Sequence, residues 1–179
     1  DGTVTGHYPI PTSDPELNAY IAPGIRCCHE STRAEDALAK ARLGMYAQLR
    51  EGSAWHDLHE VIHAVLDQKV DTRFFQLISD DAHPHTLLTL GHLDHIARRA
   101  VEEGLDPLTA IQMITINTAQ CFHMDQDLGS LTPGKCADIV LLDDLNAIHV
   151  TRVFIDGDAV AENGQYTGPM TEYTYPSFA

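Results

Sequence analysis

Residues 73–80 read Arg-Phe-Phe-Gln-Leu-Ile-Ser-Asp, and a second acidic residue, Asp81, follows directly. Consecutive aromatic and aliphatic residues are typical of a strand that is buried on both faces, as in a parallel sheet. The apolar run ends in polar residues, and the loop 82–85 that follows reads Ala-His-Pro-His. We therefore predict a buried parallel strand that carries two carboxylates at its carboxyl end.

Short apolar segments also alternate with amphipathic stretches upstream, which is the pattern of parallel β/α units. Residues 3–7 and 25–29 are candidate strands, and each ends in a histidine. Residues 43–49 are ambiguous between strand and helix. We count four β/α units in all. Because active side chains gather at the carboxyl ends of parallel strands, we expect the two histidines to lie near Asp80.

Helices are expected between and after these strands. The segment 32–35, Thr-Arg-Ala-Glu, has the form of a capping box, and Ser53 is a candidate N-cap for the apolar stretch 58–66. Single helices are predicted over 86–103, which ends before a glycine, and over 106–122, which has a proline in its first turn.

The pattern changes after Gly129 to that of an antiparallel sheet, and we place a domain boundary near Asp125. Residues 137–142 and 150–155 are candidate strands, Asp156-Gly157 has the composition of a hairpin turn, and residues 159–161 return. The sequence thus indicates an α/β region followed by a smaller β region.

Composition excludes several classes of protein. The 179 residues include 11 Lys and Arg against 26 Asp and Glu, a formal net charge of −15 that repels nucleic acid and anionic lipid. No apolar run approaches the roughly 20 residues of a membrane-spanning helix. The four cysteines form no CxxC pair, so we expect reduced thiols and a cytoplasmic location.

The polar residues at the predicted strand ends have the chemistry of a metal site. The imidazoles of His7 and His29 with the carboxylate of Asp80 suit zinc, manganese or iron, and a bound ion lowers the pKa of a water molecule, as in hydrolases. Of the adjacent Asp80 and Asp81, one would bind the metal ion and the other would meet the substrate, and a metal-bound carboxylate beside the water can act as general acid and base. The structural alternative is that the histidines bond loop carbonyls and the acidic pair is a solvated turn.

Short motifs run along nearly the whole chain, and Arg-Glu-Gly-Ser and Asp-Asp-x-His-Pro are the most specific of them. The motifs are Gly6-His7, 17–21, 24–26, His29-Glu30, 44–46, 50–53, 79–84, 91–94, 104–107, 110–113, 115–119 and 129–134 with Ala137-Asp138. With these motifs the sequence resembles the adenine deaminases of the amidohydrolase superfamily.

The resemblance implies an activity and a metal-binding set. His7 and His29 match the metal-binding histidines of the fifth and sixth barrel strands, and Asp80 matches the metal-binding, proton-shuttling aspartate of the eighth. The family hydrolyses adenine to hypoxanthine and ammonia. We expect one or two divalent ions, manganese or iron, with zinc as an alternative, and a small purine as substrate.

Three residues beside these positions are candidate substrate contacts: Glu30, Asp81 and His83. Before His29 this chain has Cys27-Cys28, where the family usually has a Ser-Asp-like pair. A thiolate there would compete for a soft metal ion.

The resemblance also implies a fold. Residues 1–124 correspond to the second half of a (β/α)8 TIM-type barrel, and residues 125–179 to the start of a small β-sandwich. The family's first-strand His-x-His pair and bridging glutamate would precede residue 1. We therefore expect a piece of a longer, homo-oligomeric enzyme, in which the 179-residue chain alone has no turnover.

Two other histidine groups compete with this interpretation. The HExxH motif His59–His63 would indicate a zinc peptidase, but a helical wheel turns both histidines away from the apolar face of 58–66, toward solvent. A second group follows Asp81. For His83 we weigh purine recognition and loop capping equally, and for His85, His92 and His95 we favour a structural role.

Two functional alternatives stay open. Another amidohydrolase could act on a cyclic amide or a different aminopurine, and substrate profiling would separate these reactions. A non-catalytic half-barrel module is the alternative of a different class. An upstream reading frame that encodes His-x-His and a distal glutamate would favour the enzyme.

Overall fold

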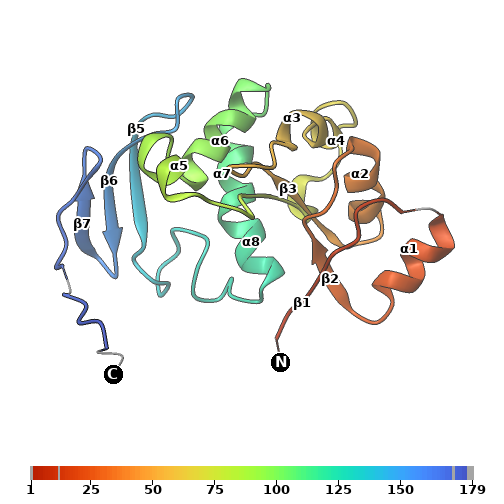
Figure 1. Ribbon diagram of the computed structural model, residues 1–179, viewed down its shortest axis with the longest axis horizontal. Helices are drawn as coiled ribbons and strands as arrows, with labels where there is room; N and C mark the ends of the chain where they lie inside the picture. Colours follow the sequence, from red (N-terminus) through yellow and green to blue (C-terminus); the bar gives the residue numbers. More distant parts are fainter. Residues whose placement is uncertain (1, 12, 171, 177–179) are drawn as a thin grey trace.

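The computed structural model describes residues 2–11, 13–170 and 172–176. They form two four-stranded sheets, a parallel sheet in the order β1-β2-β3-β4 and an antiparallel sheet in the order β5-β6-β7-β8 (Figure 1). The strands are β1 (Val4–Gly6), β2 (Ile25–Cys28), β3 (Tyr46–Arg50), β4 (Phe75–Ile78), β5 (Ile139–Asp144), β6 (His149–Ile155), β7 (Asp158–Glu162) and β8 (Gln165–Tyr166).

Along the chain, helices follow each strand of the parallel sheet, and the last of them precede the antiparallel sheet. They are α1 (Asp14–Ile21), α2 (Ala34–Arg42), α3 (Leu58–Val61), α4 (His63–Leu66), α5 (Pro84–Thr89), α6 (Leu93–Glu102), α7 (Pro107–Ile114) and α8 (Ile116–Cys121), with a 3-10 turn at Thr72–Phe74.

The four predicted β/α units are confirmed, and the ambiguous segment 43–49 contributes a strand, β3. Helix α2 ends at Arg42, and Gly44 takes a positive φ of 81°, a conformation that glycine adopts without strain. The chain then enters β3, whose five residues are all buried although Gln48 and Arg50 are polar. Gln48 interrupts the apolar pattern of segment 43–49, and this pattern alone therefore does not decide between strand and helix.

Both long helices were predicted wrongly, because each is interrupted. The segment 86–103 contains α5 and α6, separated at Gly91, which has a φ of 108°. Asp94, in the first turn of α6, accepts a hydrogen bond from the backbone N–H of the N-cap residue His92 at 2.8 Å, which stabilises the start of this helix. The segment 106–122 contains α7 and α8, separated at Thr115, whose φ and ψ of −123° and −92° are not helical.

The two predicted N-caps were also wrong. Helix α2 begins after Arg33, whose guanidinium binds the Asp36 carboxylate at 2.7 and 2.8 Å in place of a Thr32 cap. Helix α3 begins after Asp57. The Ser53 hydroxyl serves another helix, since it accepts a hydrogen bond from the backbone of His83, the residue before α5.

The core lies between the parallel sheet and its helices. Phe75 and Leu77 of β4 are 1% exposed and pack in one cluster with residues of α2, α3, α6 and α7. Ile148, which precedes β6, belongs to the same cluster, so the antiparallel part is anchored in this core.

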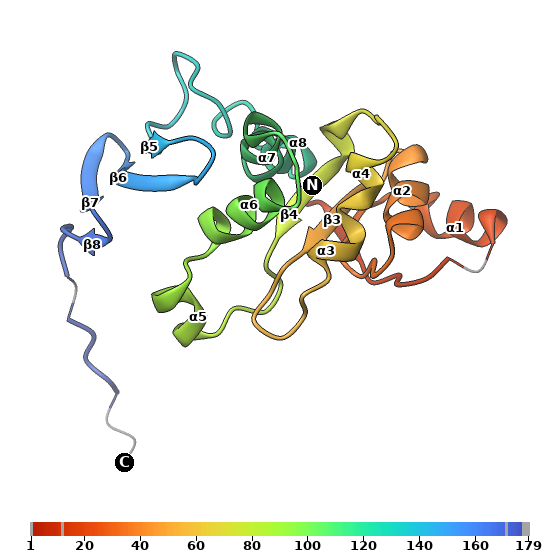
Figure 2. The ribbon, with the colours of Figure 1, turned by 90° about the horizontal axis from the view of Figure 1, so that it is seen from above.

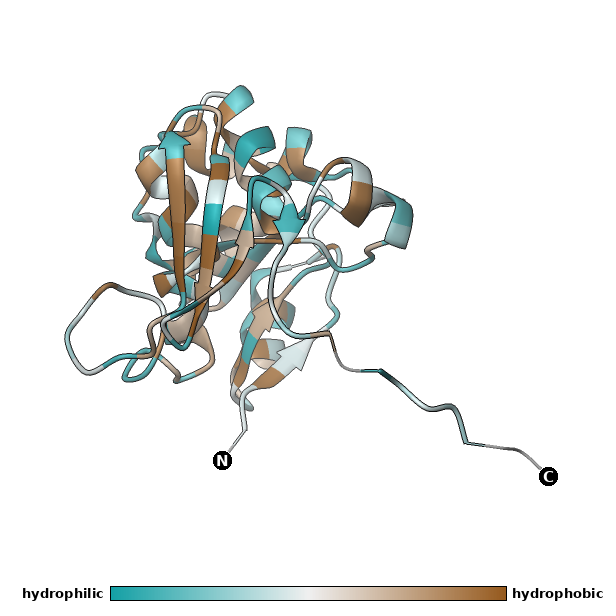
Figure 3. Cartoon of the chain, turned by 90° about the vertical axis from the view of Figure 1, so that its left-hand side faces the viewer, coloured by the Kyte–Doolittle hydropathy of each residue, from teal (hydrophilic) through white to brown (hydrophobic). Residues whose placement is uncertain are grey.

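The antiparallel sheet lies at the end of the molecule opposite α1 (Figure 2). Its predicted hairpin turn is confirmed: Asp156 and Gly157 have φ values of 51° and 87° between β6 and β7. Figure 3, viewed from the side of this sheet, shows apolar residues along its strands.

Among the described residues, no helix has the length and apolar character needed to cross a lipid bilayer. The four cysteines are free thiols, as predicted, and three of them, Cys27, Cys28 and Cys121, are buried.

Candidate functional site

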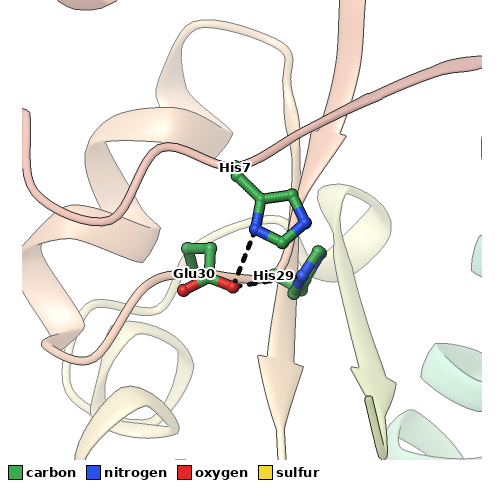
Figure 4. A group of neighbouring side chains, drawn as sticks. All are labelled: His7, His29 and Glu30. Carbon is green, nitrogen blue, oxygen red and sulfur yellow. Dashed lines mark ion pairs between the residues drawn. The ribbon is translucent and has the colours of Figure 1, made fainter.

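The carboxyl ends of β1 and β2 place two histidines and a glutamate together. Gly6 and Cys28 are partners in the parallel register, so His7 and His29, the next residues along each chain segment, meet at one edge of the sheet. Their ring centroids are 4.2 Å apart. Glu30 Oε1 lies 3.0 Å from His7 Nδ1 and 3.2 Å from His29 Nε2 (Figure 4).

This group has the composition of a divalent metal site. One ligand atom from each of His7, His29 and Glu30 lies within 4.8 Å of the other two. Imidazole nitrogen with carboxylate oxygen suits zinc, manganese and iron. Burial and the neighbouring His7 lower the pKa of His29, which favours the neutral imidazole that binds metal. The donor set therefore fits the ion that the sequence predicts.

Asp80 lies beside this group and is held by an arginine. Its Oδ2 accepts a hydrogen bond from Arg50 Nη1 at 2.9 Å, and the same nitrogen lies 3.4 Å from Glu30 Oε1. Asp80 has a φ of 60°, a left-handed conformation that aspartate and asparagine tolerate better than most residues. The side chains of His7, His29, Glu30 and Asp80 thus lie at one edge of the sheet. Asp80 is bound to Arg50 there.

The other two predicted substrate contacts have visible structural roles. Asp81 Oδ2 accepts a hydrogen bond from Ala54 N at 2.7 Å, which joins the loop after β4 to the loop after β3. His83 is exposed, and its backbone N–H donates to Ser53.

A small pocket lies next to Asp81. It is lined in part by Glu51, His92 and His95, and its volume of about 10 Å³ matches a single water molecule. A purine does not fit in it. His92 Nε2 lies 3.0 Å from the Ser79 hydroxyl, in line with the structural role favoured for this histidine.

The HExxH histidines face solvent, as the helical wheel predicts. The side chains of His59 and His63 are 65% and 44% exposed, and they pair with Glu103 and Asp67 respectively. The motif is not on one continuous helix, because α3 ends at Val61 and α4 begins at His63. This geometry does not support a zinc peptidase site.

Replacing His59 and His63 together with alanine should leave the metal content of the intact protein unchanged, because these exposed side chains pair with Glu103 and Asp67 and do not belong to the His7 group. Elemental analysis of the purified double variant checks this expectation. A His7→Ala, His29→Ala variant prepared in parallel should lose its metal. Loss of metal from the His59, His63 variant would show instead that the HExxH histidines bind the ion.

The cysteine pair before His29 is buried and divided between two environments. Cys27 packs against Tyr46 and Cys121. Its hydrogen bond to Cys121, together with burial, raises the pKa of Cys27 and so disfavours the thiolate that would bind a metal. Cys28 Sγ accepts a hydrogen bond from Tyr8 N at 3.2 Å and thereby braces the loop that carries His7.

Two histidines should give opposite pH dependences of stability. Burial and Arg98 lower the pKa of His95, so its stability contribution is complete above about pH 6.5 and is lost as the pH falls through the folded-state pKa. A hydrogen bond to Glu103 raises the pKa of His59, so that contribution is complete below about pH 6.5 and is lost as the pH rises.

Thermal midpoints at about pH 7.5 and 5.5 check these signs. Compared with the parent protein, His95→Gln should lose less stability on acidification, and His59→Gln should lose more. Equal shifts in both variants would contradict the assignment.

Sequence reasoning missed two buried cations at this edge, Arg50 and Lys40. Lys40 Nζ binds the carbonyls of Tyr8 and Pro9 and, at 2.8 Å, the Ser31 hydroxyl, so it ties together the segments that follow His7 and Glu30. A signal existed for Arg50, because it ends an apolar strand, but Lys40 reads as an ordinary surface residue of an amphipathic helix.

Comparison with known proteins identifies relatives for this architecture. The model of the amidohydrolase family matches residues 7–160. The chain is 66% identical over 177 residues to an adenine deaminase of Clostridium botulinum, which covers 99% of this chain and 30% of that protein. It is 51% identical over 173 residues to an adenine deaminase of Moorella thermoacetica, covering 97% and 29%. The chain therefore spans about 30% of the length of these relatives.

Solved structures agree at the level of the fold. A beta-aspartyl dipeptidase of Fervidobacterium islandicum superposes with a TM-score of 0.69 at 17% identity, over 93% of this chain and 49% of that one. An amidohydrolase of Thermotoga maritima gives a TM-score of 0.62 at 22% identity, over 89% and 44%. With its four parallel β/α units, and with the family model matched from residue 7 to residue 160, this chain belongs to the amidohydrolase family.

Proposed function

We propose that this chain supplies part of the active site of a metal-dependent enzyme that hydrolyses adenine to hypoxanthine and ammonia. The observation that carries the proposal is the grouping of His7, His29 and Glu30 beside Asp80 at one edge of the parallel sheet. The 66% identity to an adenine deaminase supports this substrate over others.

In this proposal His7, His29 and Asp80 hold a divalent ion, manganese or iron, with zinc as the alternative. A bound ion lowers the pKa of a water molecule and so provides a nucleophile near neutral pH. Asp80 accepts the proton that the water loses as it attacks C6 of the purine. The same carboxylate then donates the proton to the exocyclic nitrogen, which leaves as ammonia.

Glu30, Asp81 and His83 are proposed to contact the purine. Glu30 is the best placed of the three, because its carboxylate contacts both of the imidazoles that are proposed to hold the ion. Asp81 and His83 follow Asp80 on the loop that borders this edge.

The parallel sheet also supports a larger architecture. Strands β1 and β4 form its two edges, whereas a TIM-type barrel closes eight parallel strands and leaves no edge. We propose that residues 1–124 form the second half of a TIM-type barrel, that the first half completes the site, and that residues 125–179 open a β-sandwich. The free thiols fit a cytoplasmic enzyme.

The test is an ammonia-release assay with the intact, metal-loaded enzyme and with the 179-residue chain. The intact enzyme should convert adenine to hypoxanthine, with no turnover by the chain alone. Guanine, cytosine and a cyclic amide serve as comparison substrates. Preference for one of these over adenine would contradict the proposed substrate, and turnover by the chain alone would contradict the shared site.

A further inference from the structure

Arg50 is a buried cation at the carboxyl end of the parallel strands. Its guanidinium neither binds a metal ion nor transfers a proton, so its burial there requires another explanation. It is the last residue of β3, between β2 and β4, and its side chain is 4% exposed. A guanidinium with so little access to water must be compensated by acceptors from the protein.

Three acceptors come from three different loops. Arg50 Nε and Nη2 donate to Asp57 Oδ2 at 2.9 and 2.6 Å, and Nη1 donates to Asp80 Oδ2 at 2.9 Å. Nη1 also lies 3.4 Å from Glu30 Oε1. The guanidinium carbon lies 5.2 Å from the centre of the Trp55 ring. Arg50 therefore connects the loops that follow β2, β3 and β4.

The planarity of the guanidinium gives these contacts a direction. Asp57 occupies the edge formed by Nε and Nη2, and Trp55 covers the cation, so the plane of the group is fixed from its own loop. The remaining nitrogen, Nη1, then points to both Glu30 and Asp80. It also offsets the repulsion between these two carboxylates, which would otherwise favour their separation.

We propose that Arg50 is a positioning residue that holds the Asp80 carboxylate in the arrangement needed for metal binding and proton transfer, and holds Glu30 beside it at the edge where the purine is proposed to bind. The inference rests on the proposed function, because it gives Asp80 a role in both processes. Asp57 and Trp55 act through Arg50 by fixing its orientation. The alternative is that the ion pairs only stabilise the loops.

The test replaces Arg50 in the intact enzyme with methionine and with lysine. Groups that orient metal ligands typically change metal affinity or activity by about 10- to 100-fold when they are replaced. We expect Arg50→Met to weaken Zn²⁺ or Mn²⁺ binding by a factor in this range and to lower kcat more than it raises KM. Arg50→Lys should restore part of both losses, because an ammonium keeps the positive charge but lacks the planar set of donors that contacts Asp57, Asp80 and Glu30 together.

Asp57→Asn is a second route to the same test, because it leaves Arg50 and Asp80 in place while weakening the anchor. It should change metal affinity in the same direction as Arg50→Met and by less. Arg73→Met is the matched control, since Arg73 also pairs with an aspartate, Asp71, but at the exposed surface, and it should change neither quantity.

Metal affinity is measured by competition with a chromophoric chelator, so this readout does not depend on the substrate. A lower thermal midpoint in Arg50→Met and Asp57→Asn, with unchanged metal affinity and kcat per folded molecule, would overturn the inference. Failure of the parent enzyme to deaminate adenine counts against the proposed function instead, and the chelator titration still decides the role of Arg50.

Discussion

Replacing Asp80 with asparagine in the intact enzyme is expected to lower kcat for adenine deamination by roughly 10²- to 10⁴-fold, the usual contribution of a positioned acid and base. Asparagine keeps the size of the side chain and tolerates the left-handed φ of 60° at this position. Its amide oxygen can still accept from Arg50. What the variant loses is a carboxylate that can bind a cation and carry a proton.

Steady-state kinetics with a thermal melt of each sample checks this prediction. Asp71→Asn is a suitable control, because Asp71 also pairs with an arginine but is exposed and precedes β4, whereas Asp80 follows that strand. The control should keep its activity, and both variants should melt close to the parent protein. A near-normal kcat in Asp80→Asn would reject the proton-transfer role.

The second large effect is expected for Gly52→Ala, in the loop after β3. A Cβ atom at this position would lie 1.9 Å from Asp81 Oδ1 and 2.6 Å from the carbonyl oxygen of Ser79. The Ser79 atom belongs to the backbone, and Asp81 is held by its hydrogen bond from Ala54. The loop that carries Asp80 must therefore move to accommodate one methyl group.

We expect Gly52→Ala to destabilise the protein by about 1–3 kcal/mol, the usual cost of overpacking, and to lower activity because Asp80 is displaced. Urea unfolding and the adenine assay measure the two effects. Gly2→Ala is the control, since a Cβ there meets no atom within 4 Å. Unchanged stability and activity in Gly52→Ala would show that the two loops are not packed as described.

The parallel sheet could be predicted because its signals are local. The apolar run before Asp80 and the histidines that end residues 3–7 and 25–29 mark strand ends, and parallel pairing then brings those ends together. The breaks at Gly91 and Thr115 could not be predicted in the same way. They depend on contacts of the turn itself, such as the Asp94 carboxylate on the His92 backbone.

The site was predicted in part for a related reason. His7 and His29 are placed by the ends of β1 and β2, and this grouping follows from topology alone. The connection of Glu30 to Asp80 through Arg50 depends on side-chain directions in three loops, which the sequence pattern does not encode. The sequence therefore identifies Arg50 as part of the Arg-Glu-Gly-Ser motif, but it does not indicate that Arg50 connects two carboxylates.

The central claim is that His7, His29 and Asp80 share one cation, and anomalous diffraction from crystals of the zinc-substituted intact enzyme tests it most directly. We predict a peak about 2.0–2.1 Å from one imidazole nitrogen of each histidine, with an Asp80 oxygen at about 2.0–2.2 Å. A peak between His59 and His63, or an ion at His7 and His29 with Asp80 outside bonding distance, would contradict the account.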